Sequence, residues 1–98
     1  MASTKEYRDF IIEQLLELDD IRCRAMMGEY ILYYRGKVFG GIYDDRLLVK
    51  PVPAAVKMMP DAPMELPYEG AKEMILVEDV DDRRFLRELV EKMWEELK

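Results

Sequence analysis

Apolar side chains in the first part of the chain recur at the spacing of a helix, three or four residues apart, and form one face over about four turns. Ser3 and Glu6 have the spacing of a capping box, in which each side chain satisfies a free amide at the helix start. The segment therefore predicts an amphipathic helix that begins at Ser3 and ends before Asp19. Its apolar positions are Tyr7, Phe10, Ile11, Leu15 and Leu18.

The period changes to two from Ile21 onward, which is typical of β-strands. Gly28 interrupts the alternation, and Arg35-Gly36 and Asp44-Asp45 predict tight turns. Gly40-Gly41, inside a strand, predicts a bulge or a close approach of the backbone. An antiparallel meander follows from this pattern, with strands at residues 21–26, 30–34, 38–43 and 46–50.

The second half of the chain adds two helices and two short strands. Pro53 can begin a short helix that Pro60 ends, and Asp81 is a suitable N-cap for a last helix with a continuous apolar stripe. The predicted segments are a helix at 54–59, at best a short edge strand at 64–68, a strand at 73–78 and a helix that starts at Asp81.

This order of elements predicts an α+β fold, a two-layer sandwich in which the terminal helices cover one face of an antiparallel sheet. The order is a helix, three or four strands, a short helix, two strands and a long helix. The length of 98 residues suits one domain, residues 1–98. The second face of the sheet must then be solvated or covered by another chain.

The absence of histidine and the presence of one cysteine restrict the chemistry. The chain lacks the commonest general base and metal ligand, and it cannot form an internal disulfide. Alternation places Cys23 with Ile21 and Ala25, so we expect a buried structural cysteine. The acidic pair Asp81-Asp82 suits a helix start better than a metal site. We therefore predict no enzyme, no catalytic residue, no cofactor and no metal.

Charge is unevenly distributed along a chain whose net charge is −6. Residues 22–50 carry six basic and three acidic side chains, whereas both flanking segments are acidic. The tyrosines and arginines of this basic segment keep nucleic-acid binding open as an alternative, although an acidic chain is a poor default binder of nucleic acid. The polar N-terminus and the absence of a long apolar run predict a cytoplasmic protein without a signal peptide or membrane span.

The corner Met26-Met27-Gly28 is the candidate contact surface. Methionine adapts to irregular partners, and glycine lets the backbone turn sharply. The alternative is that both methionines fill gaps in the core, although alternation should expose one of them.

Two segments carry a family resemblance. Residues 24–39, RAMMGEYILYYRGKVF, and residues 42–50, IYDDRLLVK, resemble the N-terminal domain of the TfoX/Sxy family, with Met27 at a usual phenylalanine and Arg35 at a usual aspartate. The resemblance implies a secretion-chaperone-like fold, α-β₃-α-β₂-α. It also implies a role in regulating natural competence for DNA uptake, as a coactivator alongside the cyclic-AMP receptor protein. Full-length members carry a further C-terminal helical domain, and we expect a stand-alone N-terminal domain here.

The resulting hypothesis is a small non-enzymatic interaction module that resembles the N-terminal domain of a competence and transcription co-regulator. Its partner would be a protein, from the transcription machinery or a cyclic-AMP receptor protein, or a second copy in a homodimer. The alternatives are nucleic-acid binding through residues 22–50 and an unidentified small-ligand or enzymatic role. The residues predicted to bind the partner are Arg22, Arg24, Met27, Gly28 and Tyr30.

Overall fold

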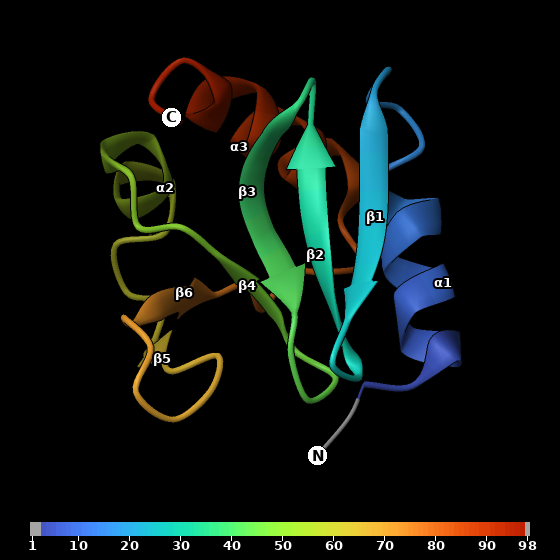
Figure 1. Cartoon of the computed structure of the whole chain (residues 1–98). Helices are drawn as coiled ribbons and strands as arrows, with labels where there is room; N and C mark the ends of the chain where they lie inside the picture. Colours follow the sequence, from blue (N-terminus) through green and yellow to red (C-terminus); the bar gives the residue numbers. More distant parts are fainter. Residues whose placement is uncertain (1–2, 98) are drawn as a thin grey trace.

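The computed structural model, which describes residues 3–97, contains three helices and one six-stranded antiparallel sheet (Figure 1). The order confirms the predicted α+β class, with four strands between the first two helices. The elements are α1 (Lys5–Gln14), β1 (Ile21–Met26), β2 (Glu29–Tyr34), β3 (Lys37–Ile42), β4 (Leu47–Val49), α2 (Pro53–Met58), β5 (Met64–Glu65), β6 (Met74–Leu76) and α3 (Arg83–Trp94).

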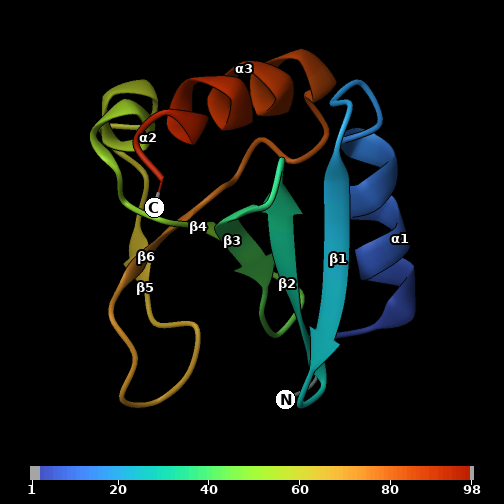
Figure 2. The same ribbon diagram turned by 45° about the horizontal axis from the view of Figure 1, so that its top comes forward.

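The strands lie in the order β1-β2-β3-β4-β6-β5, so β1 and β5 form the two edges of the sheet. The first four strands follow one another as a meander, and β6 then pairs with β4. All three helices contribute to a core on one face of the sheet, and the opposite face carries no helix (Figures 1 and 2). The predicted two-layer arrangement is confirmed, and its uncovered face is referred to below as the open face.

Three two-residue turns set the register of the meander. They are Met27-Gly28, Arg35-Gly36 and Asp44-Asp45, and both residues of each turn have a positive φ, between 48° and 85°. This is the type I′ geometry, whose twist matches that of the strands it joins. Because side chains alternate along a strand, each turn decides which residues face the helices and which face away.

The two glycines inside β3 permit a close backbone approach, as predicted. A Cβ atom on Gly40 would lie 2.2 Å from the carbonyl oxygen of Leu48, and one on Gly41 would lie 2.6 Å from that of Tyr30. The register between β2 and β3 also shifts between Leu32 and Tyr33, which is the predicted bulge.

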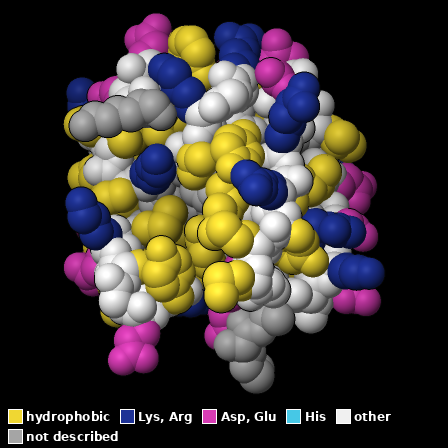
Figure 3. Space-filling model, in the orientation of Figure 1, with side chains coloured by type: hydrophobic (Ala, Val, Ile, Leu, Met, Phe, Trp, Pro, Cys, Tyr) yellow, Lys and Arg dark blue, Asp and Glu magenta, His cyan; other side chains and the backbone are white. Residues whose placement is uncertain are grey.

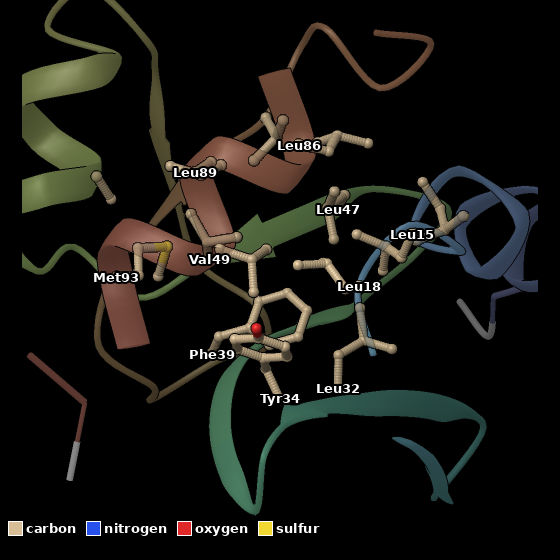
Figure 4. Close-up of a cluster of buried hydrophobic side chains, with 14 of the residues drawn as sticks. Leu15, Leu18, Leu32, Tyr34, Phe39, Leu47, Val49, Leu86, Leu89 and Met93 are labelled. Atoms are coloured by element: carbon tan, nitrogen blue, oxygen red, sulfur yellow. The ribbon is translucent and has the colours of Figure 1, made fainter. Parts of the chain in front are cut away.

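The core lies between the sheet and the helices, where leucine, valine and phenylalanine side chains from strands meet the apolar stripe of α3 (Figure 4). Phe39, at the bulge, is fully buried beside Leu32 and Tyr34. Burial of such side chains is the main favourable term in folding. The largest fully buried members include Ile11, Leu32, Phe39, Leu47, Leu86, Leu89 and Met93.

Both predicted helix caps were wrong by one residue. The Thr4 hydroxyl, not that of Ser3, accepts the hydrogen bond from the amide of Tyr7, at 3.1 Å. Asp82, not Asp81, accepts from the amide of Phe85, at 3.0 Å. In the first case the reason is visible, because the Ser3 hydroxyl accepts from the amide of Asp45 at 3.1 Å and donates to the Glu29 carboxylate at 2.7 Å, and so is engaged there and not at an amide of the helix start.

Glu29 joins the N-terminal segment to two hairpin turns. Its carboxylate accepts from the amide of Ser3 at 2.9 Å and from the amide of Asp44 at 3.1 Å, in addition to the Ser3 hydroxyl. Asp45 donates its own amide to the Ser3 hydroxyl at 3.1 Å. Ser3 is buried by this arrangement, so its hydroxyl depends on Glu29 and Asp45 for hydrogen bonds, whereas its amide also donates to the carbonyl of Gly28 at 3.1 Å.

Glu29→Ala should therefore lower the free energy of unfolding by about 1–3 kcal/mol, because the Ser3 hydroxyl and the amide of Asp44 lose their acceptor and the amide of Ser3 loses one of its two. Urea denaturation followed by circular dichroism measures this change. The matched control is Glu69→Ala, in the exposed loop after β5, which should stay within about 0.5 kcal/mol of the unsubstituted protein. Equal losses in both variants would contradict the bridging role of Glu29.

Candidate partner-binding face

The open face is built by the residues that alternate away from the helices on the first three strands. Arg22 of β1 lies opposite Tyr33 of β2, and Arg24 lies opposite Ile31. Tyr33 in turn lies opposite Val38 of β3. Since directly opposite residues of an antiparallel pair share a face, these five side chains form one surface of alternating charge and apolar area.

Apolar side chains gather across the middle of the open face in Figure 3, with lysine and arginine side chains among and around them. Aspartate and glutamate side chains lie mostly near the rim of this view. The chain as a whole has a net charge of −6, so the basic character of this face contrasts with the average of the molecule. Such a difference can steer an acidic partner toward one side of a protein.

A shallow groove crosses the β1 end of the open face. It has a volume of about 580 Å³ and is lined by Arg22, Cys23, Arg24, Tyr33 and Gly36. The Arg22 side chain is 79% exposed and makes only a long ion pair with Asp20, at 3.4 Å. Exposed pairs of this kind contribute little to stability, so the Arg22 guanidinium can leave Asp20 and bind another protein at a small cost in free energy.

A second groove, of about 920 Å³, lies at the other end of the open face. Tyr43 and Tyr68 line it with their ring centroids 6.3 Å apart, and Lys50 and Lys72 supply positive charge. Burial, the largest cause, raises the pKa of Tyr43, so its hydroxyl remains a hydrogen-bond donor at neutral pH. Leu48 is fully buried in β4, in register with Gly41. Part of this end of the face is therefore covered by the chain itself.

The five predicted partner-binding residues do not form one surface. Arg22 and Arg24 lie on the open face, and Met27 and Gly28 form the turn at its end. Tyr30 is only 8% exposed and belongs to the core, with the Arg8 guanidinium 5.2 Å from its ring centre. Tyr33, and not Tyr30, therefore lies beside the arginines on the open face.

Ile31 and Val38 also belong to this surface, and the sequence analysis did not select them. Both are half-buried, on the same face as Tyr33. For Ile31 the signal is its distance from the Met27-Gly28 turn, because every second residue along β2 returns to the same face. For Val38 it is the Arg35-Gly36 turn, across which Val38 lies opposite Tyr33.

The prediction that Cys23 is buried was wrong, since Cys23 is exposed. Its side chain does point to the same face as Leu32, its partner in β2 and a core residue. However, β1 is the edge strand, and α1 leaves a groove of about 380 Å³ alongside it. Alternation predicted the direction of the side chain correctly, whereas burial depended on how far α1 extends over the edge.

Met27 combines two unusual properties. Its side chain is 98% exposed, the largest exposure among the exposed large apolar residues, and its φ of 52° lies in the left-handed region. Residues other than glycine, asparagine and aspartate adopt that region at a cost. The predicted alternative, that both methionines of the corner fill the core, is not what the structure has, because Met26 is also 46% exposed.

Two general features of the described residues bear on the choice of function. Within residues 3–97, no three cysteine, aspartate or glutamate side chains are grouped so that they could hold a metal ion. In the same range, no helix has both the length and the apolar character to cross a lipid bilayer.

The chain matches the TfoX N-terminal domain family over residues 13–96, which includes every strand and α3. It is also similar to an uncharacterised 12.7 kDa protein in the trpE 5′ region of Spirochaeta aurantia. The two are 35% identical over 80 residues, which is 82% of this chain and 70% of that protein. No solved structure matched the chain.

Met27→Asn should raise the free energy of unfolding by about 1 kcal/mol, because asparagine tolerates the left-handed conformation that methionine adopts here at a cost. Thermal and urea unfolding measure the gain. The same substitution one residue earlier, Met26→Asn, is the matched control, since Met26 has strand geometry and should gain nothing. A Met27 variant no more stable than its control would show that the turn is unstrained.

The Cys23 thiol should react with an aromatic disulfide reagent in the native protein, at one equivalent per chain. Partial burial, the largest cause, raises the pKa of this thiol, while the nearby Arg8 acts in the opposite direction. Since the thiolate is the reactive form, the rate should rise with pH and reach half its maximum above the pH found for free cysteine. Reaction only after urea is added would contradict the exposed position.

Proposed function

The chain belongs to the TfoX N-terminal domain family, and from that premise we propose that it is a non-enzymatic interaction module that binds a protein partner through its open face. The observation that carries this proposal is the surface formed by Arg22, Arg24, Ile31, Tyr33 and Val38. It is apolar and basic in an acidic chain, and no helix covers it.

The charges of this surface support recognition more than stability. Arg24 makes no ion pair with any residue in the range 3–97, and the Arg22 pair is exposed. On the helical side, by contrast, Arg83 pairs with Glu13 of α1 at 3.3 Å, and Arg87 pairs with Glu17 at 3.2 Å. The basic side chains that join the helices thus have internal partners, whereas those of β1 are available to an external one.

The composition of the surface also suits a protein ligand. Tyrosine and arginine are enriched at the centres of protein interfaces, where an aromatic ring offers area and a guanidinium offers several donors. The open face places Tyr33 directly opposite Arg22. Met27, almost fully exposed at the adjacent turn, adds an adaptable apolar contact at the edge of the same surface.

The finer proposal concerns the kind of partner. The resemblance to competence and transcription co-regulators makes the transcription machinery, including a cyclic-AMP receptor protein, the first class to test. Complementarity with Arg22 and Arg24 further selects a partner with an acidic surface. Nucleic acid is the competing ligand for a basic and aromatic face, and the net charge of −6 opposes it.

The test is affinity capture from a lysate of the native host, with the protein carrying Arg22→Glu and Arg24→Glu compared with the unsubstituted protein. The matched control carries Arg84→Glu and Lys92→Glu, which make the same change in net charge on the exposed side of α3. We expect the open-face variant to lose a protein that both the unsubstituted protein and the control retain. Each capture is repeated after nuclease treatment.

If all three proteins capture the same partners, the proposal that the open face is the binding surface is wrong. Loss of the captured protein on nuclease treatment, with binding of purified nucleic acid that weakens steeply with salt, would instead assign the face to nucleic acid. Retention of a transcription regulator after nuclease treatment, and its loss in the open-face variant alone, would support the finer proposal.

A further inference from the structure

The free edge of β1 is the feature that the proposed function leaves unused. β1 is six residues long and pairs on one side only, with β2. The other edge of the sheet, β5, has two residues. An edge strand presents main-chain donors and acceptors to solvent and is a ready template for a further strand. The sheet therefore has one long edge at which another segment can pair.

The turn register shows which main-chain groups of β1 face outward. In a two-residue hairpin the residues that flank the turn, Met26 and Glu29, form a hydrogen-bonded pair, and every second pair repeats this state. At the far end the amide of Arg35 donates to the carbonyl of Asp20 at 3.0 Å, which fits the same series. The main-chain groups of the remaining residues, Ile21, Cys23 and Ala25, thus point away from the sheet.

The two sides of this edge differ in chemistry. On the open face, Arg22 and Arg24 stand beside the edge. On the helical side, a groove of about 380 Å³ lies between β1 and α1, with Ile12, Ile21 and Ala25 as its aliphatic residues. Cys23, Tyr30 and the Arg8–Asp9 ion pair complete its lining, so the groove offers apolar area beside a charged pair. A strand added here would place alternate side chains beside the arginines and in the groove.

A second copy of this chain fits the edge poorly. Pairing two β1 edges requires outward-facing residues to oppose each other, so that Cys23 meets Cys23 and Arg22 meets Arg24 of the other copy. A shift by two residues places Arg24 opposite Arg24. Like charges directly opposite are destabilising, and charged side chains are a known protection against edge-to-edge pairing. The arginines therefore disfavour pairing of two β1 edges and favour a partner strand that carries acidic side chains.

We propose that the free edge of β1 binds an extended segment of a partner protein by antiparallel strand addition, and that this segment alternates apolar and acidic residues. The acidic side chains lie opposite Arg22 and Arg24, and the apolar ones enter the groove beside α1. Main-chain hydrogen bonds supply affinity and the alternating side chains supply specificity. This inference rests on the proposed function and specifies the partner segment.

The probe is a capped synthetic peptide, Ser-Val-Glu-Val-Glu-Val-Ser, whose two glutamates can oppose Arg24 and Arg22 when the central valine opposes Cys23. The readout is the rate at which the Cys23 thiol, the only thiol of the chain, reacts with a disulfide reagent. A bound strand covers this thiol, so the rate should fall as the peptide saturates. A second readout is hydrogen exchange of the Cys23 and Ala25 amides, which should slow.

Charge-swapped pairs test the recognition. A peptide with lysine in place of both glutamates should bind the unsubstituted protein roughly tenfold more weakly, because two favourable cross-strand pairs become repulsive. The same lysine peptide should bind best to the variant carrying Arg22→Glu and Arg24→Glu. The α3 variant with Arg84→Glu and Lys92→Glu should retain the preference for glutamate.

The main-chain pairing is tested by removing one outward donor. Ala25→Pro eliminates an amide that points away from β2, a position at which an edge strand tolerates proline. It should abolish protection of Cys23 while circular dichroism stays unchanged. If this variant does not fold, a peptide with a methylated central amide makes the same test on the unsubstituted protein.

Peptide binding with protection of Cys23 and reversal of preference in the charge-swapped variant would support the proposal. Binding that leaves the Cys23 rate unchanged would overturn it and leave the proposed function of the open face intact. Dimerisation with Cys23 protected in the absence of peptide would assign the edge to a second copy. Protection by an oligonucleotide and not by the peptide would assign it to nucleic acid, and failure of every peptide to bind would also overturn the proposal.

Discussion

The positive φ angles at the three two-residue turns are the constraint on which the rest of the structure depends. Each turn holds its two flanking strands in one register, and a slip by one residue would exchange the two faces of a strand. The Met27-Gly28 turn fixes Leu32 toward the core and Tyr33 away from it. The alternation that the turns set decides which side chains pack in the core and which form the open face. It also decides which main-chain groups of β1 point away from the sheet.

The distribution of charge follows the same division into layers. On the helical side, Glu13 of α1 pairs with Arg83 of α3, and Glu17, three residues after the end of α1, pairs with Arg87. These exposed pairs connect the two ends of the chain. On the open face, arginine and lysine side chains lie among and around apolar area (Figure 3). Arg22 has one exposed ion pair there, and Arg24 has none with any residue in the range 3–97. A net charge computed for the whole chain conceals this separation, because the helical side dominates the sum.

The sequence predicted the order of elements, the turns and the glycine bulge, because these depend on residues close to one another in the chain. It could not decide which predicted contact residues are exposed. Tyr30 and Tyr33 are equally suited to a strand, and only the helices that cover one face distinguish them. Cys23 shows the same limit, since its exposure depends on how α1 lies across the edge. The first helix cap shifted because the Ser3 hydroxyl bonds to Glu29 and to the amide of Asp45, which are 26 and 42 residues away.

The shortness of β5 has a consequence for assembly. A filament built by joining sheets edge to edge needs two complementary edge strands on every molecule, one for each neighbour. Here only β1 is long, and β5 offers two residues beside an ion pair between Glu65 and Arg46. Copies of this chain joined through their β1 edges therefore have no second long edge from which to extend the sheet, so assembly of this kind cannot proceed beyond a pair.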